Sequence, residues 1–152
     1  MTFALPSYAH IPGQNPRHRS DAFDDAKASA LVVTEDTTAP ENQAWLFGLE
    51  LLASGFYWEC HEVLEIVWLR ARPNSRARAA VQGVIQIANA ALKLEMQKPK
   101  AASRLASIAE LHFEDACRAD KQLAMGLKYG QIQSALMQIR SGKLQGQELD
   151  FR

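Results

Sequence analysis

Prolines and apolar residues after position 40 constrain the fold more than any other feature of the chain. Only Pro73 and Pro99 occur beyond Pro40, and the residue before a proline is disfavoured in the helical region, so helices end near these points. Between the breaks, apolar residues recur every three or four positions, as they do along one face of a helix. No alternating, β-branched segment bounded by turns appears after residue 40. The pattern predicts an all-α fold.

The same breaks and apolar stripes give approximate bounds for the helices. The first ends before Gly55, and the third follows Ser75, a residue suited to cap a helix. The predicted helices cover residues 40–54, 57–70, 75–97, 100–118 and 131–140. Short links between the second, third and fourth favour antiparallel neighbours. We therefore expect a compact bundle of about five helices in a single domain, without an internal repeat.

The first forty residues differ in character from the bundle. Four of the six prolines lie there, beside a polar run that lacks apolar periodicity. We expect residues 1–40 to form an extended, proline-containing N-terminal arm, residues 41–143 the helical bundle and residues 144–152 a loose tail. Ser20 is placed to cap a short helix within the arm. The apolar side chains of the arm suggest that it drapes over the bundle or over a neighbouring subunit, which would make a homo-oligomer.

Charge and composition exclude several classes of function. Seventeen Lys and Arg residues balance seventeen Asp and Glu residues, so no overall field attracts nucleic acid or another polyanion. Apolar residues make up 47% of the chain, but no run of about 18 of them could cross a bilayer. The first residues lack the basic segment and long apolar core of a secretory signal. We expect a cytoplasmic protein without a membrane or nucleic-acid partner, and free thiols at Cys60 and Cys117.

The stretch GFYWECHEVLEIVWLR places four ionisable residues ahead of its final arginine in an otherwise apolar helix. At about 100° per residue, His61, Glu65 and Trp68 fall on one face, one above the next. Glu59 and Glu62 fall more than a quarter turn away and are predicted to meet solvent. The sequence therefore predicts a histidine–carboxylate pair beside a tryptophan.

The next predicted helix carries three amide side chains with the same spacing. Gln82, Gln86 and Asn89 stand at positions i, i+4 and i+7, on one narrow stripe. In an antiparallel hairpin this stripe would face His61 and Glu65. We expect at least one hydrogen bond between this pair and the three amides. Gly83, beside the amides, would let the two helix backbones approach closely.

Three interpretations of this polar cluster remain open. The first is a buried network in which the amides satisfy the imidazole and the carboxylate. The second is a catalytic site, in which Glu65 orients the imidazole of His61 and leaves the other ring nitrogen free as a general base. The third is a metal site, with His61 and Glu65 as two ligands and His112 as the candidate third. The sequence reads H-E-x-x-E rather than H-E-x-x-H, so the ligand set is incomplete and we expect no tightly held zinc.

Arginines form a second, weaker feature of the sequence. Arg70, Arg72, Arg76 and Arg78 crowd around Pro73 and could hold a phosphate. The favoured interpretation is that cations at the end of the preceding helix stabilise its dipole and that the others solvate the loop.

Two segments of the chain resemble a known family of bacterial and archaeal proteins. HEVLEIVW, residues 61–68, is similar to the H-x-x-x-E-x-x-W signature of the domain of unknown function 309, and VQGVIQIANAALK is similar to its Gln-Gly-x-x-Gln-x-Ala stretch. The resemblance covers roughly residues 45–110. It implies an all-helical fold and a metal-binding or other functional role for the motif, but no established reaction.

We expect a small-ligand or metal-assisted hydrolytic site in this region. His61 and Glu65 are its candidate catalytic residues, and a divalent metal ion is the cofactor that such a site suggests. The candidate ligand-binding residues lie on the two polar stripes and beside them: Trp58, Trp68, Gln82, Gln86 and Asn89. The alternative is a non-enzymatic interaction module whose polar cluster only fixes helix packing. The sequence leaves open whether the protein is an enzyme.

Overall fold

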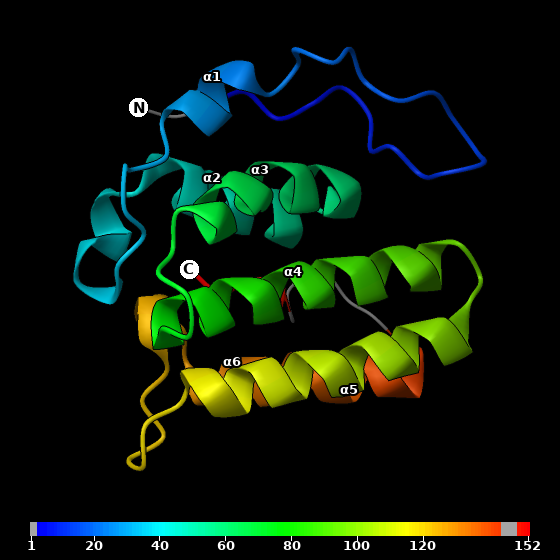
Figure 1. The fold of residues 1–152 in the computed structure, drawn as a ribbon. Helices are drawn as coiled ribbons and strands as arrows, with labels where there is room; N and C mark the ends of the chain where they lie inside the picture. Colours follow the sequence, from blue (N-terminus) through cyan, green and yellow to red (C-terminus); the bar gives the residue numbers. More distant parts are fainter. Residues whose placement is uncertain (1–2, 144–148) are drawn as a thin grey trace.

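The computed structural model describes residues 3–143 and 149–152, and the fold in this part of the chain is all-α, as predicted (Figure 1). Within these residues the only β-type pairing consists of isolated bridges, Thr34 with Ala71 and Cys117 with Leu123. The helices, with η marking 3-10 turns, are α1 (Asp24–Ala28), η1 (Asp36–Glu41), α2 (Gln43–Ala53), α3 (Tyr57–Leu69), α4 (Arg76–Glu95), α5 (Pro99–Ala116), η2 (Ala124–Gly126) and α6 (Tyr129–Ser141).

Local signals set most of the helix ends. The side chain of Ser75 accepts a hydrogen bond from the backbone N–H of Arg78 at 3.1 Å, which caps α4 as expected. Gly142 ends α6 in the left-handed conformation, with φ 74°, which costs glycine little. Pro99 is the first residue of α5 rather than a break before it. A proline is tolerated there because the first turn of a helix needs no intrahelical N–H donor.

The long helices form two packed layers around α4. Figure 1 shows α2 and α3 side by side on one side of α4, with α5 and α6 on the other. α4 contacts α3, α5 and α6, and eleven of its residues are buried. It therefore forms the centre of the core and also the floor of any site between the two layers.

Gly83 was predicted to allow a close approach between α3 and α4, but the structure shows small residues at the contacts of other helix pairs. A Cβ atom added at Gly83 would lie 2.6 Å from the ring of Phe113 on α5, so Gly83 makes room for α5 rather than for α3. The close approach of α2 and α3 instead depends on Gly48, whose missing side chain leaves space for Leu64.

The N-terminal arm packs against the bundle in the same chain (Figure 1, dark blue). Phe3 contacts Phe47 of α2 with ring centroids 5.3 Å apart. The predicted Ser20 cap is wrong, because α1 begins at Asp24 with Phe23 in the capping position.

The end of the chain is packed rather than loose where the structure describes it. Leu149 and Phe151 are buried with the core residues, which corrects the expectation of a loose tail for these residues. Residues 144–148 of the predicted tail lie outside the described residues. In the part of the chain that is described, no helix combines the length and apolar character that a membrane crossing requires.

Candidate functional site

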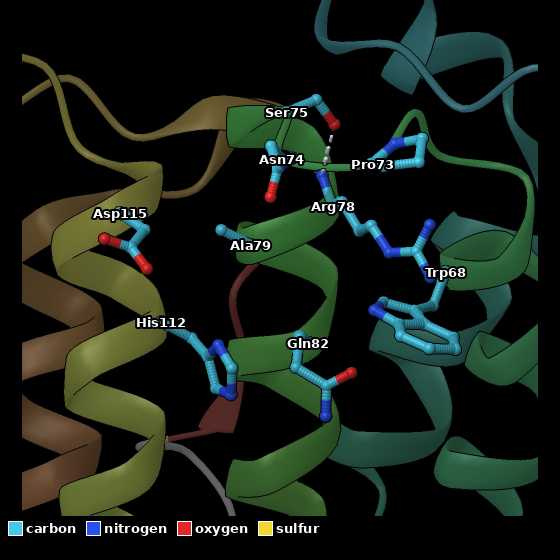
Figure 2. A pocket seen from close by; sticks show the side chains of 9 residues that line it. All are labelled: Trp68, Pro73, Asn74, Ser75, Arg78, Ala79, Gln82, His112 and Asp115. Atoms are coloured by element: carbon cyan, nitrogen blue, oxygen red, sulfur yellow. Dashed lines mark hydrogen bonds between the residues drawn. The ribbon is translucent and has the colours of Figure 1, made fainter.

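An open pocket of about 830 Å³ lies between the two layers, at the end of the bundle where α3 leads into α4. Figure 2 shows α4 as its floor, with α5 at one side and Trp68 of α3 at the other. Its lining residues come from α3, α4, α5 and the loop between α3 and α4: Trp68, Pro73, Asn74, Ser75, Arg78, Ala79, Gln82, His112 and Asp115. This volume is in the range of about 300–1,000 Å³ that is typical of small-molecule sites.

Trp68 and Arg78 form one wall of the pocket. The guanidinium carbon of Arg78 lies 4.1 Å from the centroid of the Trp68 ring, in a cation–π contact. Arg78 also donates a hydrogen bond to the backbone carbonyl of Ala71 at 3.1 Å. Among the described residues no carboxylate pairs with Arg78. The wall therefore presents an anchored positive charge beside an aromatic surface.

His112 and Asp115 form the opposite wall, one turn apart on α5 (Figure 2). Burial lowers the pKa of His112 below its ordinary value of 6.5, and the Asp115 carboxylate opposes this shift. His112 is therefore mainly neutral at pH 7, with one ring nitrogen as a donor and the other as an acceptor. No Lys or Arg pairs with the exposed carboxylate of Asp115 in the described part of the chain.

Gln82 extends from α4 between these two walls (Figure 2). Its side chain is half-buried, and no described residue forms a hydrogen bond with its amide group. A primary amide offers two N–H donors and one carbonyl acceptor. Gln82 can therefore bind a polar ligand through groups that the protein does not already occupy.

The structure does not bring His61 and Glu65 into this pocket. Glu65 is exposed, and Nδ1 of His61 lies 3.8 Å from Oε1 of its neighbour Glu62. The predicted hydrogen bond between this pair and the amide stripe is wrong, because no such bond forms among the described residues. Asn89 instead donates to Gln86 on its own helix, at 3.4 Å.

The prediction that Glu59 meets solvent is wrong. Glu59 is fully buried, and its Oε2 accepts hydrogen bonds from the backbone N–H of His10 and from Nε2 of His18, both at 2.6 Å. Both donors belong to the N-terminal arm. No described residue forms a hydrogen bond with the other oxygen, Oε1. Glu62, the other glutamate expected at the surface, is half-buried, with Oε2 3.5 Å from Nζ of Lys27.

Aromatic rings surround the two histidines of the arm. The ring of His18 stacks on Tyr8, with centroids 4.4 Å apart, and His10 meets Trp58 edge-on at 4.9 Å. Trp58, expected to flank a ligand site, therefore packs against the arm. Asn15 accepts a hydrogen bond from the backbone N–H of Ile11 at 2.9 Å, which closes the turn of the arm at this point.

The two cysteines are free thiols, as predicted. Cys60 is fully buried, and burial, assisted by the negative charge of Glu59, raises the pKa of its thiol far above the ordinary range. A thiol of this kind is unreactive, because the thiolate is the nucleophile. Cys60 is therefore a core residue.

The three metal-ligand candidates of the sequence do not converge. His112 lines the pocket, whereas His61 and Glu65 do not. Within residues 3–143 and 149–152, no group of three or more His, Cys, Asp or Glu side chains is arranged to hold a metal ion.

Arg78 and Asp115 line the pocket but were not among the site residues predicted from the sequence. Arg78 belongs to the cluster of arginines around Pro73, but its position in the first turn of α4 places it over Trp68. Asp115 follows His112 by three positions, the spacing that puts two side chains on one helical face. That spacing was a usable signal for Asp115, whereas the contact between Arg78 and Trp68 depends on how α3 meets α4.

Residues 45–105 match the family described as domain of unknown function (DUF309), so the predicted family is confirmed for this part of the chain. No curated protein and no solved structure matches the chain. The matched span includes Trp68, Arg78 and Gln82 but not His112 and Asp115. The family description states no activity, and functional inference therefore rests on the geometry of the site.

Proposed function

We propose that this DUF309 protein binds a small polar molecule in the pocket between α3, α4 and α5. The observation that supports the proposal most directly is the composition of the pocket: an aromatic wall, an anchored cation, a neutral imidazole and an unoccupied amide line one open cavity. Ligand sites typically combine apolar walls with a few convergent polar groups. Trp68 supplies the apolar wall, and Arg78, Gln82 and His112 supply the polar groups.

The packing of the helices supports a binding role over a purely structural one for these polar residues. Apolar contacts hold the helices together here, including Leu64 over Gly48 and Phe113 over Gly83. Gln82 has no hydrogen-bond partner among the described residues, so it does not fix the register of α4 against α3. The amide of Gln82 is therefore available for a ligand.

A more specific form of the proposal is that the protein hydrolyses the molecule that it binds. In this pocket His112 is the group suited to general base catalysis, because a neutral imidazole can accept a proton from water. His61 and Glu65, the pair predicted from the sequence, are accessible on the adjacent part of α3 and form the second candidate. Replacing His112 by Gln separates the two, since hydrolysis that depends on His61 would survive this change.

The binding proposal is tested by filling the pocket. Ala79 lies at the floor of the pocket and is half-buried, so Ala79→Leu would occupy the cavity without removing a polar group. The wild-type protein is screened by NMR against a mixture of small carboxylates, phosphate esters, amines and peptides. We expect ligands to shift the indole resonance of Trp68 and the imidazole resonances of His112, and Ala79→Leu to weaken the shifts at least about tenfold.

Ala101→Leu is the matched control for this experiment. Ala101 is also half-buried on a helix, but it does not line the pocket. The control should bind as the wild type does. Absence of shifts at Trp68 and His112 across the whole mixture, or equal binding to both leucine variants, would rule out this pocket as the site.

A further inference from the structure

The pocket holds two opposite charges that the described part of the protein does not neutralise. Among the described residues, the guanidinium of Arg78 contacts only the Trp68 ring and the carbonyl of Ala71, and Asp115 has no cationic partner. The nearby Arg72 and Arg76, in contrast, lie 3.6 and 3.9 Å from the carboxylates of Glu35 and Asp36. The cations just outside the pocket are therefore paired, whereas the charges that line it are not.

The two unpaired charges occupy opposite walls. Figure 2 shows Arg78 beside Trp68 at one side, Asp115 and His112 on α5 at the other, and Gln82 of α4 between the two sides. The guanidinium of Arg78 lies over Trp68 of α3, whereas Asp115 is on α5, and both of these helices pack against α4, which lies between them (Figure 1). A ligand that contacts both charges therefore spans the pocket. The two charged groups of an α-amino acid share one carbon atom, so a longer zwitterion matches charges on opposite walls better.

The groups between the charges suit a chain of peptide-like polarity. Gln82 offers donors and an acceptor, and the neutral ring of His112 offers one of each. The planar guanidinium of Arg78 matches a carboxylate, with which it can form two parallel hydrogen bonds. The carboxylate of Asp115 accepts hydrogen bonds from an ammonium group.

We propose that the pocket binds an extended zwitterion, such as a short peptide with free termini, with its carboxylate on Arg78 and its ammonium group on Asp115. This inference rests on the proposed function and adds the charge pattern of the ligand. The other ligand with the same pattern is an ω-amino acid, which lacks the peptide groups that Gln82 and His112 would bind.

The test uses four derivatives of triglycine that differ in which terminus is charged. Triglycine carries both charges, N-acetyl-triglycine lacks the ammonium group, triglycinamide lacks the carboxylate, and N-acetyl-triglycinamide lacks both. Affinities for the full chain are measured by NMR titration or calorimetry. We expect triglycine to bind most tightly and the loss of either charge to weaken binding about 10- to 100-fold, as expected for a charge-assisted hydrogen bond. Glycine and 6-aminohexanoate, tested alongside, separate the requirement for length from that for peptide groups.

Two variants assign the charges to residues. Asp115→Asn should bind triglycine and N-acetyl-triglycine equally well and still prefer triglycine to triglycinamide. Arg78→Gln should bind triglycine and triglycinamide equally well and still prefer triglycine to N-acetyl-triglycine. Glu114→Gln is the matched control, because Glu114 is exposed, neighbours Asp115 on α5 and does not line this pocket. The control removes the same charge and should leave all four affinities unchanged.

The possible failures are distinguishable. Equal affinities for the four peptides, or equal effects of Asp115→Asn and Glu114→Gln, would overturn the zwitterion inference and leave the proposed function standing. If none of the four peptides binds but other molecules in the mixture shift the resonances of Trp68 and His112, the zwitterion inference is likewise wrong and the proposed function stands. If no small molecule shifts these resonances, both proposals fail.

Discussion

The carboxylate of Glu59 connects the N-terminal arm to α3. It is fully buried and accepts hydrogen bonds at 2.6 Å from the backbone of His10 and from the ring of His18. Removing the acceptor of a buried hydrogen bond typically costs about 1–3 kcal/mol for each donor that is left without a partner. At the scale of the residue, this one carboxylate holds the N-terminal arm on α3.

We predict that Glu59→Ala lowers the free energy of unfolding by about 3 kcal/mol in urea denaturation, because two buried donors lose their acceptor. Glu62→Ala is the control, since Glu62 is half-buried and its ion pair with Lys27, at 3.5 Å, is near the surface. Such pairs contribute about 0–1 kcal/mol. Equal losses for the two variants would mean that Glu59 does not anchor the arm.

Loss of the His61 side chain, in contrast, should change the stability of the protein little. Its side chain is 33% exposed, and Glu65 is exposed to water. The loss of the imidazole therefore strands no buried charge, and His61→Ala should change the free energy of unfolding by no more than about 1 kcal/mol. A loss of several kcal/mol in the same urea experiment would show that His61 belongs to a structural network.

At the scale of the element, α4 and α5 depend on the absence of one side chain. A Cβ atom at Gly83 would lie 2.6 Å from the Phe113 ring, closer than such contacts occur in folded proteins. Overpacking of a core typically costs about 1–3 kcal/mol. This exceeds the gain of about 1 kcal/mol that alanine brings over glycine in a helix.

Gly83→Ala should therefore destabilise the protein by up to about 2 kcal/mol, measured by thermal or urea unfolding. Gly130 provides the matched control, because it also lies within a helix, α6, and a Cβ atom there meets nothing within 4 Å. Gly130→Ala should be neutral or stabilising by up to about 1 kcal/mol. A stabilising Gly83→Ala would show that Phe113 can move aside.

At the scale of the whole molecule, burial of His112 in the folded protein lowers its affinity for a proton. Burial lowers the pKa of His112 below 6.5, and Asp115 opposes this. As the pH falls through about 6.5, the unfolded chain therefore takes up the proton first. The contribution of His112 to stability is complete above that pH and is lost as the pH falls toward the lowered pKa of the folded state.

We predict that the free energy of unfolding decreases less between about pH 7.5 and pH 5.5 in His112→Gln than in the wild type. Asp115→Asn should have the reverse effect, because it removes the charge that raises the pKa of His112. Urea unfolding at several pH values checks both. Identical pH dependence in all three proteins would show that the folded state does not disfavour the charged form of His112.

The amino-acid sequence by itself determined the helical class, the approximate ends of the long helices and the family that residues 45–105 match. These depend on local signals, such as the Ser75 cap, Gly142 and the spacing of apolar residues, which act within one or two turns. The sequence also identified Trp68, Gln82 and His112, which line the pocket. Helical periodicity was enough to select these polar and aromatic positions.

Only the tertiary structure decided which of these residues meet and which are buried. Periodicity gives the angle of a side chain about its own helix, but not what covers that face. Glu59 is buried because an arm about forty residues earlier in the chain packs over it, and Arg78 reaches Trp68 because the loop at Pro73 sets how α4 follows α3. His61 and Glu65 remain outside the pocket because apolar packing, rather than hydrogen bonding between polar stripes, fixes the way α3 lies on α4.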